Sequence, residues 1–296
     1  MGGERPPRRV LRGELDDVRR LPHPRAHGAR GVLRLRGLLR PGRDVGAGRR
    51  RCVVRVSVSG GGRRGVLHAA CLAAAGHEVV LLDPDPRALA ALRAGPGTAE
   101  PRLPRLLALG LVSGRLRPTT DRTAVAGARV HLLCVGAGSA PDAGGAARVA
   151  TLRDALDGLA PHLGPGDLVV GRARVPAGTA ELLAACLAAD GVPATVAWVP
   201  DEHRPGHAVV DLLHPARVVH GVPAGPAGER ASAILDVLHA VQLASGAPRS
   251  VTDLATAESL GHGHGAPRAH DDGAAPGAAD VASSTPRAAF DAVGAA

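Results

Sequence analysis

The sequence predicts an α/β fold built on a doubly wound parallel sheet, and three observations lead to this prediction. Short apolar runs alternate with segments of helical composition from about residue 52 to residue 260. The apolar runs are continuous, as expected for strands covered on both faces. A glycine-rich turn separates the first run from the first helical segment. With 296 residues, 45% of them apolar and 21% charged, the chain is long enough to bury a large core.

The first predicted elements form a strand–helix–strand unit. Cys52–Ser59 is predicted as a buried strand because valine recurs along it. Val66–Ala75 has the composition of a helix, and Gly76 is the residue type that commonly ends one. Glu78–Asp83 is the second strand. The next helix is predicted over Pro84–Ala94, because proline is tolerated in the first turn of a helix.

The alternation of strands and helices continues along the chain. Further apolar runs predict strands at Ala128–Val135, Asp167–Gly171 and Thr195–Val199. Segments rich in alanine and leucine predict helices at Pro104–Leu111, Ala146–Leu163, Thr179–Ala189 and Gly228–Leu243, and the start of a helix at Thr252–Leu260. After these elements Gly, Ala, Pro and Asp dominate, so a low-complexity tail is expected over residues 261–296.

The positive charge of the chain is concentrated at its beginning. Residues 1–51 contain 15 Arg and 5 acidic residues, and the whole chain has a formal net charge of +9. Since this segment shows no hydrophobic period, we predict a basic, disordered extension, and we do not expect nucleic acid as a partner. The chain contains no Lys and 1% aromatic residues. It therefore has no Lys nucleophile, no Walker-type P-loop and no aromatic platform for single-stranded nucleic acid.

A glycine pattern follows the first predicted strand. Gly60, Gly62 and Gly65 form G-x-G-x-x-G ahead of a predicted helix, and Asp83 ends the second strand. The first glycine permits a tight turn, the second admits a pyrophosphate to the backbone, and the third allows close helix–strand packing. A carboxylate at Asp83 suits an adenosine ribose diol and repels a 2′-phosphate. The pattern therefore predicts a Rossmann-like sheet that binds NAD; the alternative is a glycine-rich turn with a capping Asp.

A series of short segments over roughly residues 52–260 makes a more specific signal than the glycine pattern alone. The segments are Val54–Val80, Leu89–Gly95, Ser113–Leu116, Thr119–Asp121, Ala160–Leu163, Val175–Thr179, Asp211, His214–Val219, Thr252–Asp253 and Ala257–Glu258. In this order they resemble the UDP-glucose/GDP-mannose dehydrogenase family. The resemblance implies an NAD-dependent enzyme that oxidises the C6 hydroxyl of a UDP-sugar to a carboxylate through a thiohemiacetal on a cysteine, for polysaccharide precursor synthesis.

The resemblance also implies roles for particular residues and segments. It implies a general base or a water-positioning group at Asp201, a substrate contact at Arg204, and NAD contacts at Gly60, Gly62, Gly65 and Asp83. Residues 52–250 would form the NAD-binding domain, and residues 251–260 would start the family's central helix. A homodimer through that helix is compatible with the resemblance, but the helical pattern is lost after residue 260.

Several positions depart from the family's pattern. The family's Thr-Pro is Ala137-Gly138 here, and its Lys-Ser-Thr is Arg172-Ala173-Arg174. Its second substrate-segment Glu is Pro205, and its Lys and Asn fall on Gly261 and Gly265. The nucleophilic Cys segment and the second, UDP-binding domain have no counterpart in the sequence. A second hypothesis is therefore a truncated, catalytically impaired dinucleotide-binding remnant of the family.

The remaining expectations concern thiols, metals and location. Four widely spaced cysteines, three of them in apolar runs, indicate free thiols in a reducing compartment. No apolar run is long enough for a membrane span, so we expect a cytoplasmic protein. Three histidines with two neighbouring aspartates offer metal-ligand chemistry, but they lie in Gly/Pro-rich sequence, and we expect no metal site: His262, His264, His270, Asp271 and Asp272.

Overall fold

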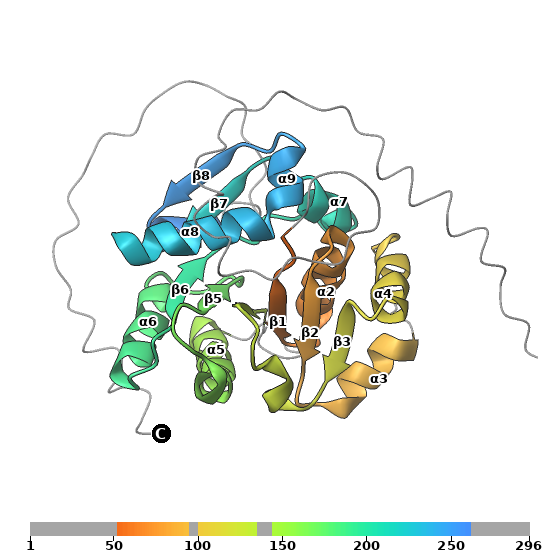
Figure 1. The fold of residues 1–296 in the computed structure, drawn as a ribbon, viewed down its shortest axis with the longest axis horizontal. Coiled ribbons are helices and arrows are strands. Elements are labelled where there is room, and N and C mark those ends of the chain that lie inside the picture. Colours follow the sequence, from red (N-terminus) through yellow and green to blue (C-terminus); the bar gives the residue numbers. More distant parts are fainter. Residues whose placement is uncertain (1–51, 95–99, 135–143, 262–296) are drawn as a thin grey trace, which may run out of the picture. The chain divides into compact units, whose positions relative to one another are not determined.

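The computed structural model describes residues 52–94, 100–134 and 144–261, and its central feature is a single sheet (Figure 1). The sheet has eight strands in the order β3-β2-β1-β4-β5-β6-β7-β8. Every neighbouring pair is parallel except β6 and β7. The strands are β1 (Arg55–Ser59), β2 (Glu78–Leu82), β3 (Leu116–Thr119), β4 (Val130–Leu133), β5 (Leu168–Gly171), β6 (Thr195–Trp198), β7 (Val218–Gly221) and β8 (Arg249–Thr252).

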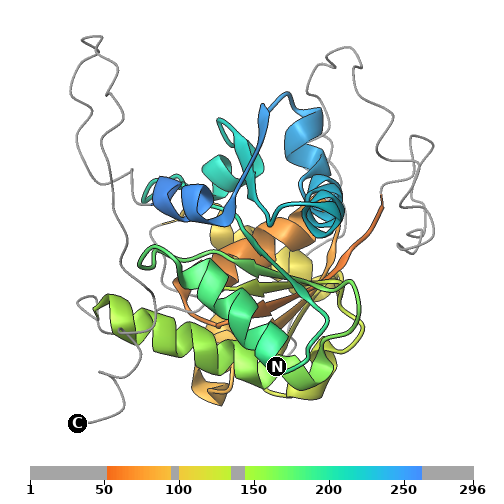
Figure 2. The ribbon, with the colours of Figure 1, turned by 90° about the vertical axis from the view of Figure 1, so that its left-hand side faces the viewer.

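Helices cover both faces of this sheet. They are α2 (Arg63–Ala75), α3 (Pro86–Ala94), α4 (Leu103–Val112), α5 (Gly145–Leu159), α6 (Thr179–Ala189), α7 (Ala208–Leu213), α8 (Pro226–Leu238), α9 (Ala240–Ala244) and α10 (Leu254–Leu260). Buried side chains of α2, α4, α7 and α8 form one core with the strands, and those of α5, α6 and α10 form a second core. Figure 2 shows this division, with orange α2 on one side of the sheet and green α5 and α6 on the other.

The central strands are buried on both faces, as their continuous apolar runs predict. Val56 and Val58 of β1 contribute to the first core, whereas Val169 of β5 contributes to the second. Trp198, at the end of β6, is completely buried. A Cβ on Gly171 of the neighbouring strand would lie 2.0 Å from the Trp198 ring, so the glycine makes room for the largest side chain of the core. The sequence-based prediction of a doubly wound parallel sheet is therefore confirmed.

Three strands were not predicted from the sequence. β3 contains an arginine and a proline and lies at one edge of the sheet, where a missing N–H is tolerated. β8 lies at the other edge and is largely exposed, so it has no apolar run to reveal it. β7 is buried but has only four residues, between a proline-containing turn and another turn. Edge position therefore explains the omission of β3 and β8, whereas β7 was missed because only two valines stand before its His220.

Some element boundaries also differ from the prediction. The helix predicted over Gly228–Leu243 is two helices, because α8 ends before His239 and α9 begins after it. The helix predicted to reach Leu163 ends as α5 at Leu159, where a 3₁₀ turn containing Pro161 takes over. The first strand begins three residues later than predicted, which leaves Cys52 exposed, while the other three cysteines are buried and free.

Candidate functional site

The glycine loop Gly60–Gly62 connects β1 to α2 at the point where the strand order reverses. β2 lies on one side of β1 and β4 lies on the other, so a crevice opens above the carboxyl end of β1. Gly60 has a φ of +109°, a left-handed conformation that glycine adopts readily. Its N–H donates a hydrogen bond to the carbonyl oxygen of Leu82 at 2.9 Å, which ties the loop to the end of β2.

The other two glycines of the motif meet different constraints. A Cβ at Gly65 would lie 1.7 Å from the carbonyl oxygen of Gly60, so α2 packs directly on the loop. Among the described residues, a Cβ at Gly62 would meet no atom within 4 Å beyond its chain neighbours. The fold itself therefore requires glycine at positions 60 and 65, whereas position 62 borders open space in which a ligand can approach the backbone.

The N-terminus of α2 supplies the electrostatics of this space. Its N-cap, Gly62, has no side chain to accept from the helix, and the first turn contains no acidic residue. The N–H groups of the first turn have no partner within the helix, and the helix dipole places about half a positive charge there. Such a helix start binds phosphate groups. The local geometry therefore fits the pyrophosphate of a dinucleotide.

Asp83 follows β2 and lies against the glycine loop. Its Oδ2 accepts a hydrogen bond from the N–H of Gly61, and its Oδ1 accepts one from the N–H of Asp85 at 2.8 Å. Each carboxylate oxygen keeps a second lone pair that can accept from a ribose hydroxyl. The structure thus brings together the four residues expected to hold a dinucleotide: Gly60, Gly62, Gly65 and Asp83.

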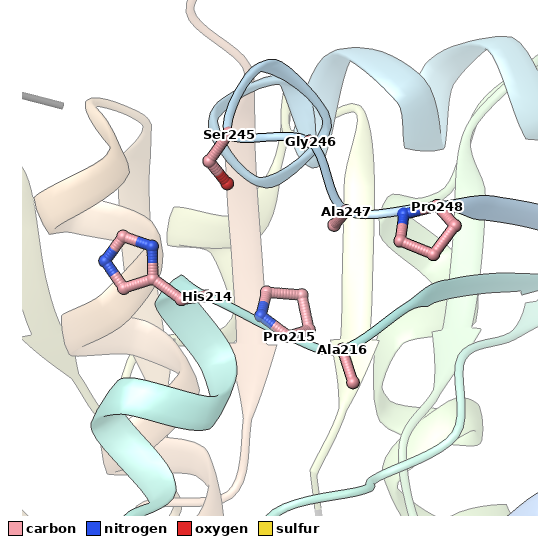
Figure 3. Close-up of a pocket in the computed structure, with 7 residues that line it drawn as sticks. All are labelled: His214, Pro215, Ala216, Ser245, Gly246, Ala247 and Pro248. Atoms are coloured by element: carbon pink, nitrogen blue, oxygen red, sulfur yellow. The ribbon is translucent and has the colours of Figure 1, made fainter. Parts of the chain in front are cut away.

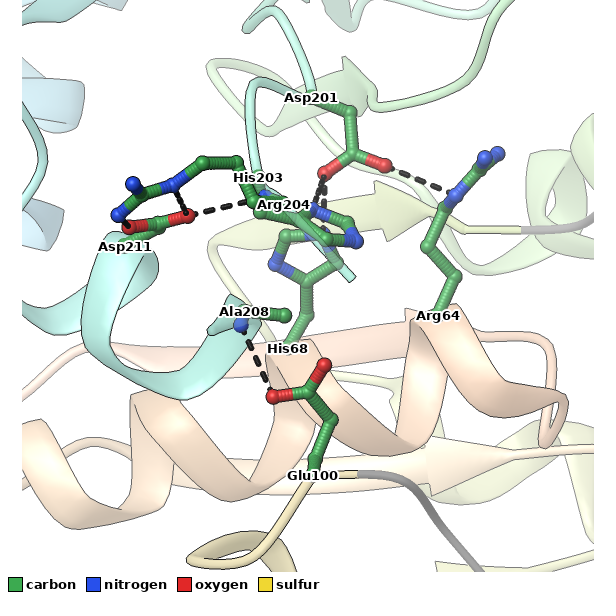
Figure 4. Close-up of polar contacts among 8 residues, drawn as sticks. All are labelled: Arg64, His68, Glu100, Asp201, His203, Arg204, Ala208 and Asp211. Atoms are coloured by element: carbon green, nitrogen blue, oxygen red, sulfur yellow. Dashed lines mark hydrogen bonds and ion pairs between the residues drawn. The ribbon is translucent and has the colours of Figure 1, made fainter. Parts of the chain in front are cut away.

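Asp201 lies three residues after β6 and is buried. Its Oδ1 accepts hydrogen bonds from His203 Nδ1 at 2.8 Å and from His68 Nε2 at 3.2 Å (Figure 4). Its Oδ2 forms an ion pair with Arg64 Nε at 2.8 Å. His68 and Arg64 belong to α2, so these contacts tie the segment around Asp201 to the helix that starts at the glycine loop.

These contacts set the protonation states around Asp201. Burial alone would raise the pKa of the Asp201 carboxyl, but hydrogen bonds from His203 and His68 outweigh burial and keep that pKa well below its ordinary value. Burial, with the nearby Arg172 guanidinium, lowers the pKa of His68 to about 4. At neutral pH Asp201 is therefore an anion and His68 is neutral. A carboxylate of such low pKa is a weak proton acceptor, although it still accepts hydrogen bonds.

Arg204, the expected substrate contact, lies on the loop between Asp201 and α7. Its guanidinium pairs with Asp211 through two contacts, Nε to Oδ2 at 3.1 Å and Nη2 to Oδ1 at 2.7 Å (Figure 4). The Arg204 N–H donates to the same carboxylate at 2.9 Å. The side chain of Arg204 is 68% exposed. The pair therefore fastens the loop to α7 and leaves the guanidinium at the surface.

Glu100 is a further residue of this region, and sequence reasoning missed it. Its buried carboxylate accepts hydrogen bonds from the N–H groups of Gly206 at 2.7 Å and Ala208 at 2.9 Å. It therefore fastens the segment between Asp201 and α7 to the part of the chain that precedes α4. The available signal was a lone acidic residue beside Pro101 ahead of a predicted helix, which does not point to a partner more than 100 residues away.

A separate surface cavity of about 420 Å³ lies between the turns that precede β7 and β8 (Figure 3). Its lining consists of His214, Pro215, Ala216, Ser245, Gly246, Ala247 and Pro248. These turns lead into the amino ends of their strands, whereas the glycine loop, Asp83 and Asp201 follow carboxyl ends. The cavity is therefore not part of the site built around the glycine loop.

Some predicted features lie outside the described residues, namely Ala137-Gly138, Gly265 and the histidine-rich stretch from His262 to Asp272. Within residues 52–94, 100–134 and 144–261, no three His, Cys, Asp or Glu side chains gather in a way that would hold a metal ion. In the same part of the chain, no helix combines the length and the apolar character needed to cross a membrane.

Comparison with known protein families gives a match over residues 54–239, to the model described as the UDP-glucose/GDP-mannose dehydrogenase family, NAD binding domain. The chain is 33% identical over 173 residues to a UDP-glucose 6-dehydrogenase of Rhizobium meliloti, a match that covers 57% of this chain and 39% of that protein. It is 39% identical over 85 residues to a GDP-mannose 6-dehydrogenase of Pseudomonas putida, which covers 28% of this chain and 19% of that protein.

Solved structures give the same result. A UDP-glucose dehydrogenase from Pyrobaculum islandicum aligns with a TM-score of 0.63 and 34% identity, over 72% of this chain and 49% of that chain. A GDP-mannose dehydrogenase from Pseudomonas aeruginosa aligns with a TM-score of 0.60 and 26% identity, over 70% of this chain and 48% of that chain. The chain thus matches about half of the length of these solved structures, and less than half of the curated relatives.

Proposed function

The chain belongs to the UDP-glucose/GDP-mannose dehydrogenase family, and from this premise we propose that it binds NAD above β1 and serves the NAD-dependent oxidation of a UDP-sugar at its C6 hydroxyl. The observation that carries the proposal is the open space beside Gly62, which faces the uncapped start of α2. Free backbone N–H groups and a helix dipole at this position attract a pyrophosphate.

The residues around this space fit NAD. The loop amides would hold the pyrophosphate, and Asp83 would accept a hydrogen bond from the adenosine ribose. A 2′-phosphate would meet the negative charge of Asp83, which favours NAD over NADP. Bound NAD supplies the hydride acceptor of the reaction. In a doubly wound sheet each half binds one half of a dinucleotide, so the nicotinamide would lie over β4 to β6. Asp201, which follows β6, would then lie on the side where the sugar hydroxyl approaches.

Within this proposal, Asp201 orients a hydroxyl or a water and does not remove its proton. Three donors already occupy the carboxylate, and its depressed pKa makes it a weak base. A carboxylate offers about four acceptor positions, so one stays available to a ligand. Arg204 would contact the UDP-sugar from the surface of the same segment, because its guanidinium is largely exposed.

A second candidate function is NAD binding without completed oxidation. The observation that favours it is the state of the buried thiols. Burial raises the pKa of Cys71 and of Cys134 to about 12, so neither is a thiolate at neutral pH. The thiolate is the nucleophilic form of cysteine, and a thiohemiacetal therefore has no suitable nucleophile at these two positions.

Both candidates are tested by one experiment on the full chain. NAD is titrated by calorimetry, UDP-glucose is then added, and NADH is followed by absorbance. The first candidate predicts saturable NAD binding and NADH formation that depends on UDP-glucose; the second predicts the binding alone. NADP in place of NAD is the matched control, and it should bind more weakly because of Asp83. Absence of NAD binding would contradict both candidates.

A further inference from the structure

Arg172 is a buried arginine that directly follows β5. Its N–H donates to the carbonyl oxygen of Leu133 at 3.2 Å, which places it beside the carboxyl end of β4. The residue is 8% exposed. Within the described residues its buried Nε has no hydrogen-bond partner. An unpartnered polar group in a protein interior is unfavourable, and an unpartnered charge is more so.

The neighbours of Arg172 do not neutralise it. Asp201 is the carboxylate whose charge acts on Arg172 among the described residues, but both oxygens of Asp201 are engaged by other donors. The thiols of Cys71 and Cys134 also lie near Arg172, and they are protonated at neutral pH because burial raises their pKa values to about 12. The anion near Arg172 is therefore Asp201, and this carboxylate is already paired with Arg64.

Arg64 brings a second guanidinium group close to Asp201. Arg64 pairs with Asp201 through Nε, and its terminal nitrogens point away from that carboxylate (Figure 4). Arg172 directly follows β5 and Asp201 lies three residues after β6, the neighbouring strand, so both lie at the same edge of the sheet. Two guanidinium groups, those of Arg64 and Arg172, thus accompany one carboxylate at this edge of the sheet. The local excess of positive charge fits one incoming anion.

We propose that Arg172 and Arg64 form a subsite for the carboxylate of a bound ligand. The proposal rests on the proposed function, since the carboxylate would be the one formed when a sugar C6 hydroxyl is oxidised. A dinucleotide pyrophosphate is a less suitable ligand for the two arginines than a carboxylate. The backbone N–H groups at the start of α2, beside β1, would already bind the pyrophosphate. Arg172 and Asp201 instead follow β5 and β6, in the half of the sheet that would face the reacting group. A guanidinium binds a planar carboxylate through two parallel hydrogen bonds.

The first test compares UDP-glucuronate with UDP-glucose by calorimetry on the NAD-saturated full chain. The carboxylate ligand should bind roughly tenfold or more tightly than the alcohol, as expected for added charge-assisted hydrogen bonds. In Arg172→Met this preference should disappear. The control Arg230→Gln, which removes the same charge from an exposed position on α8, should keep it. Equal binding of the two sugars by the wild-type chain would overturn the proposal and leave the proposed function intact.

The second test needs neither NAD nor a UDP-sugar. The melting temperature of the full chain is measured in sodium glucuronate, sodium phosphate and sodium chloride at matched ionic strength. Glucuronate should raise it for the wild type and for Arg230→Gln, but not for Arg172→Met. Stabilisation by glucuronate in a chain that binds no UDP-sugar would support the subsite and contradict the proposed function. Stabilisation by phosphate alone, or by none of the salts, would overturn the carboxylate assignment.

A third measurement separates a ligand-binding role from a structural one. Without ligand, Arg172→Met should melt at the same temperature as the wild type or higher, because the substitution removes an uncompensated buried charge and keeps the side-chain stem. A marked fall in melting temperature would mean that Arg172 is held by the fold, and this would contradict the subsite. If that variant does not fold, the comparison of glucuronate with chloride on the wild-type chain still decides the proposal.

Discussion

At the scale of single residues, the three glycines of the motif are required for different reasons. Gly60 adopts a positive φ, and Gly65 allows α2 to touch the loop, so both are demanded by the fold. Neither condition applies to Gly62, since in the part of the chain that the structure describes a Cβ there would meet nothing within 4 Å. Under the proposed function, the absence of a side chain at position 62 leaves room for a ligand to approach the backbone.

This difference gives a paired prediction. Gly62→Val should melt as the wild type does but weaken NAD binding at least about tenfold, because its side chain fills the ligand's space. Gly65→Ala should lower stability as well, because its Cβ would collide with the Gly60 carbonyl oxygen. Thermal melts and NAD calorimetry on both variants check this. A Gly62→Val chain that binds NAD normally would contradict the assignment of the open space.

The Asp201 ion pairs give a second prediction at this scale. Asp201→Asn removes the charge of a buried carboxylate that accepts from two histidines and pairs with the partly exposed Arg64, so it should lower the unfolding free energy by about 1–3 kcal/mol. The control is Asp211→Asn, whose partner Arg204 is largely exposed, and which should cost about 1 kcal/mol or less. Urea unfolding of both variants provides the comparison. Equal losses of unfolding free energy in the two variants would show that burial does not determine how much each ion pair stabilises the fold.

At the scale of elements, buried carboxylates join segments that are distant in the sequence. Glu258 of α10 accepts hydrogen bonds from the N–H groups of Gly178, at 2.8 Å, and of Ala180. It thereby occupies the start of α6, where a negative charge also suits the helix dipole. Glu100 fulfils the same function at the start of α7. These two contacts hold α10 and the segment after Asp201 in place.

The contact of Glu258 is testable by a conservative change. Glu258→Gln keeps the shape but removes the charge, so the unfolding free energy should fall by about 1–3 kcal/mol, with faster amide exchange in α10 and the first turn of α6. Glu181→Gln is the matched control, because Glu181 lies in the first turn of α6 but is exposed. Hydrogen exchange that responds equally to both variants would contradict the role given to Glu258.

Much of the element order follows from the sequence, because the central strands are continuous apolar runs and glycine or proline marks their ends. The edge strands β3 and β8 could not be predicted, since exposed strands carry no such run. For the site, the glycine loop and Asp83 are local and were predicted as a unit. The partners of Asp201 could not be predicted, because His68 precedes Asp201 by 133 residues and only the fold brings the two side chains together.

At the scale of the whole molecule, several buried histidines make stability depend on pH. Burial lowers the pKa of His68 to about 4 and that of His220 to about 3, and it lowers the pKa of His239 well below the ordinary value. His220 stacks on His239 with ring centroids 5.3 Å apart, and their nitrogens are 3.1 Å apart. These rings are neutral in the folded chain at neutral pH, so acid must protonate them preferentially in the unfolded chain.

The sign of the pH dependence follows from these shifts. In the unfolded chain the histidines titrate near 6.5, and in the folded chain His68 and His220 titrate near 4 and 3. Stability is therefore complete above pH 6.5 and falls as the pH drops from 6.5 towards 4, by on the order of a few kcal/mol for each histidine. Urea unfolding between pH 8 and pH 4.5 measures this. A flat profile over that range would contradict the neutral, buried state of these rings.

The central claim is that the glycine loop and Asp83 together hold NAD, and the most direct measurement is calorimetric titration of the full chain with NAD beside its Asp83→Ala variant. We predict saturable heat of binding for the wild type, and weaker binding for the variant with a smaller preference for NAD over NADP. An absence of binding heat in a folded wild-type chain, or unchanged affinity and cofactor preference in Asp83→Ala, would contradict the account.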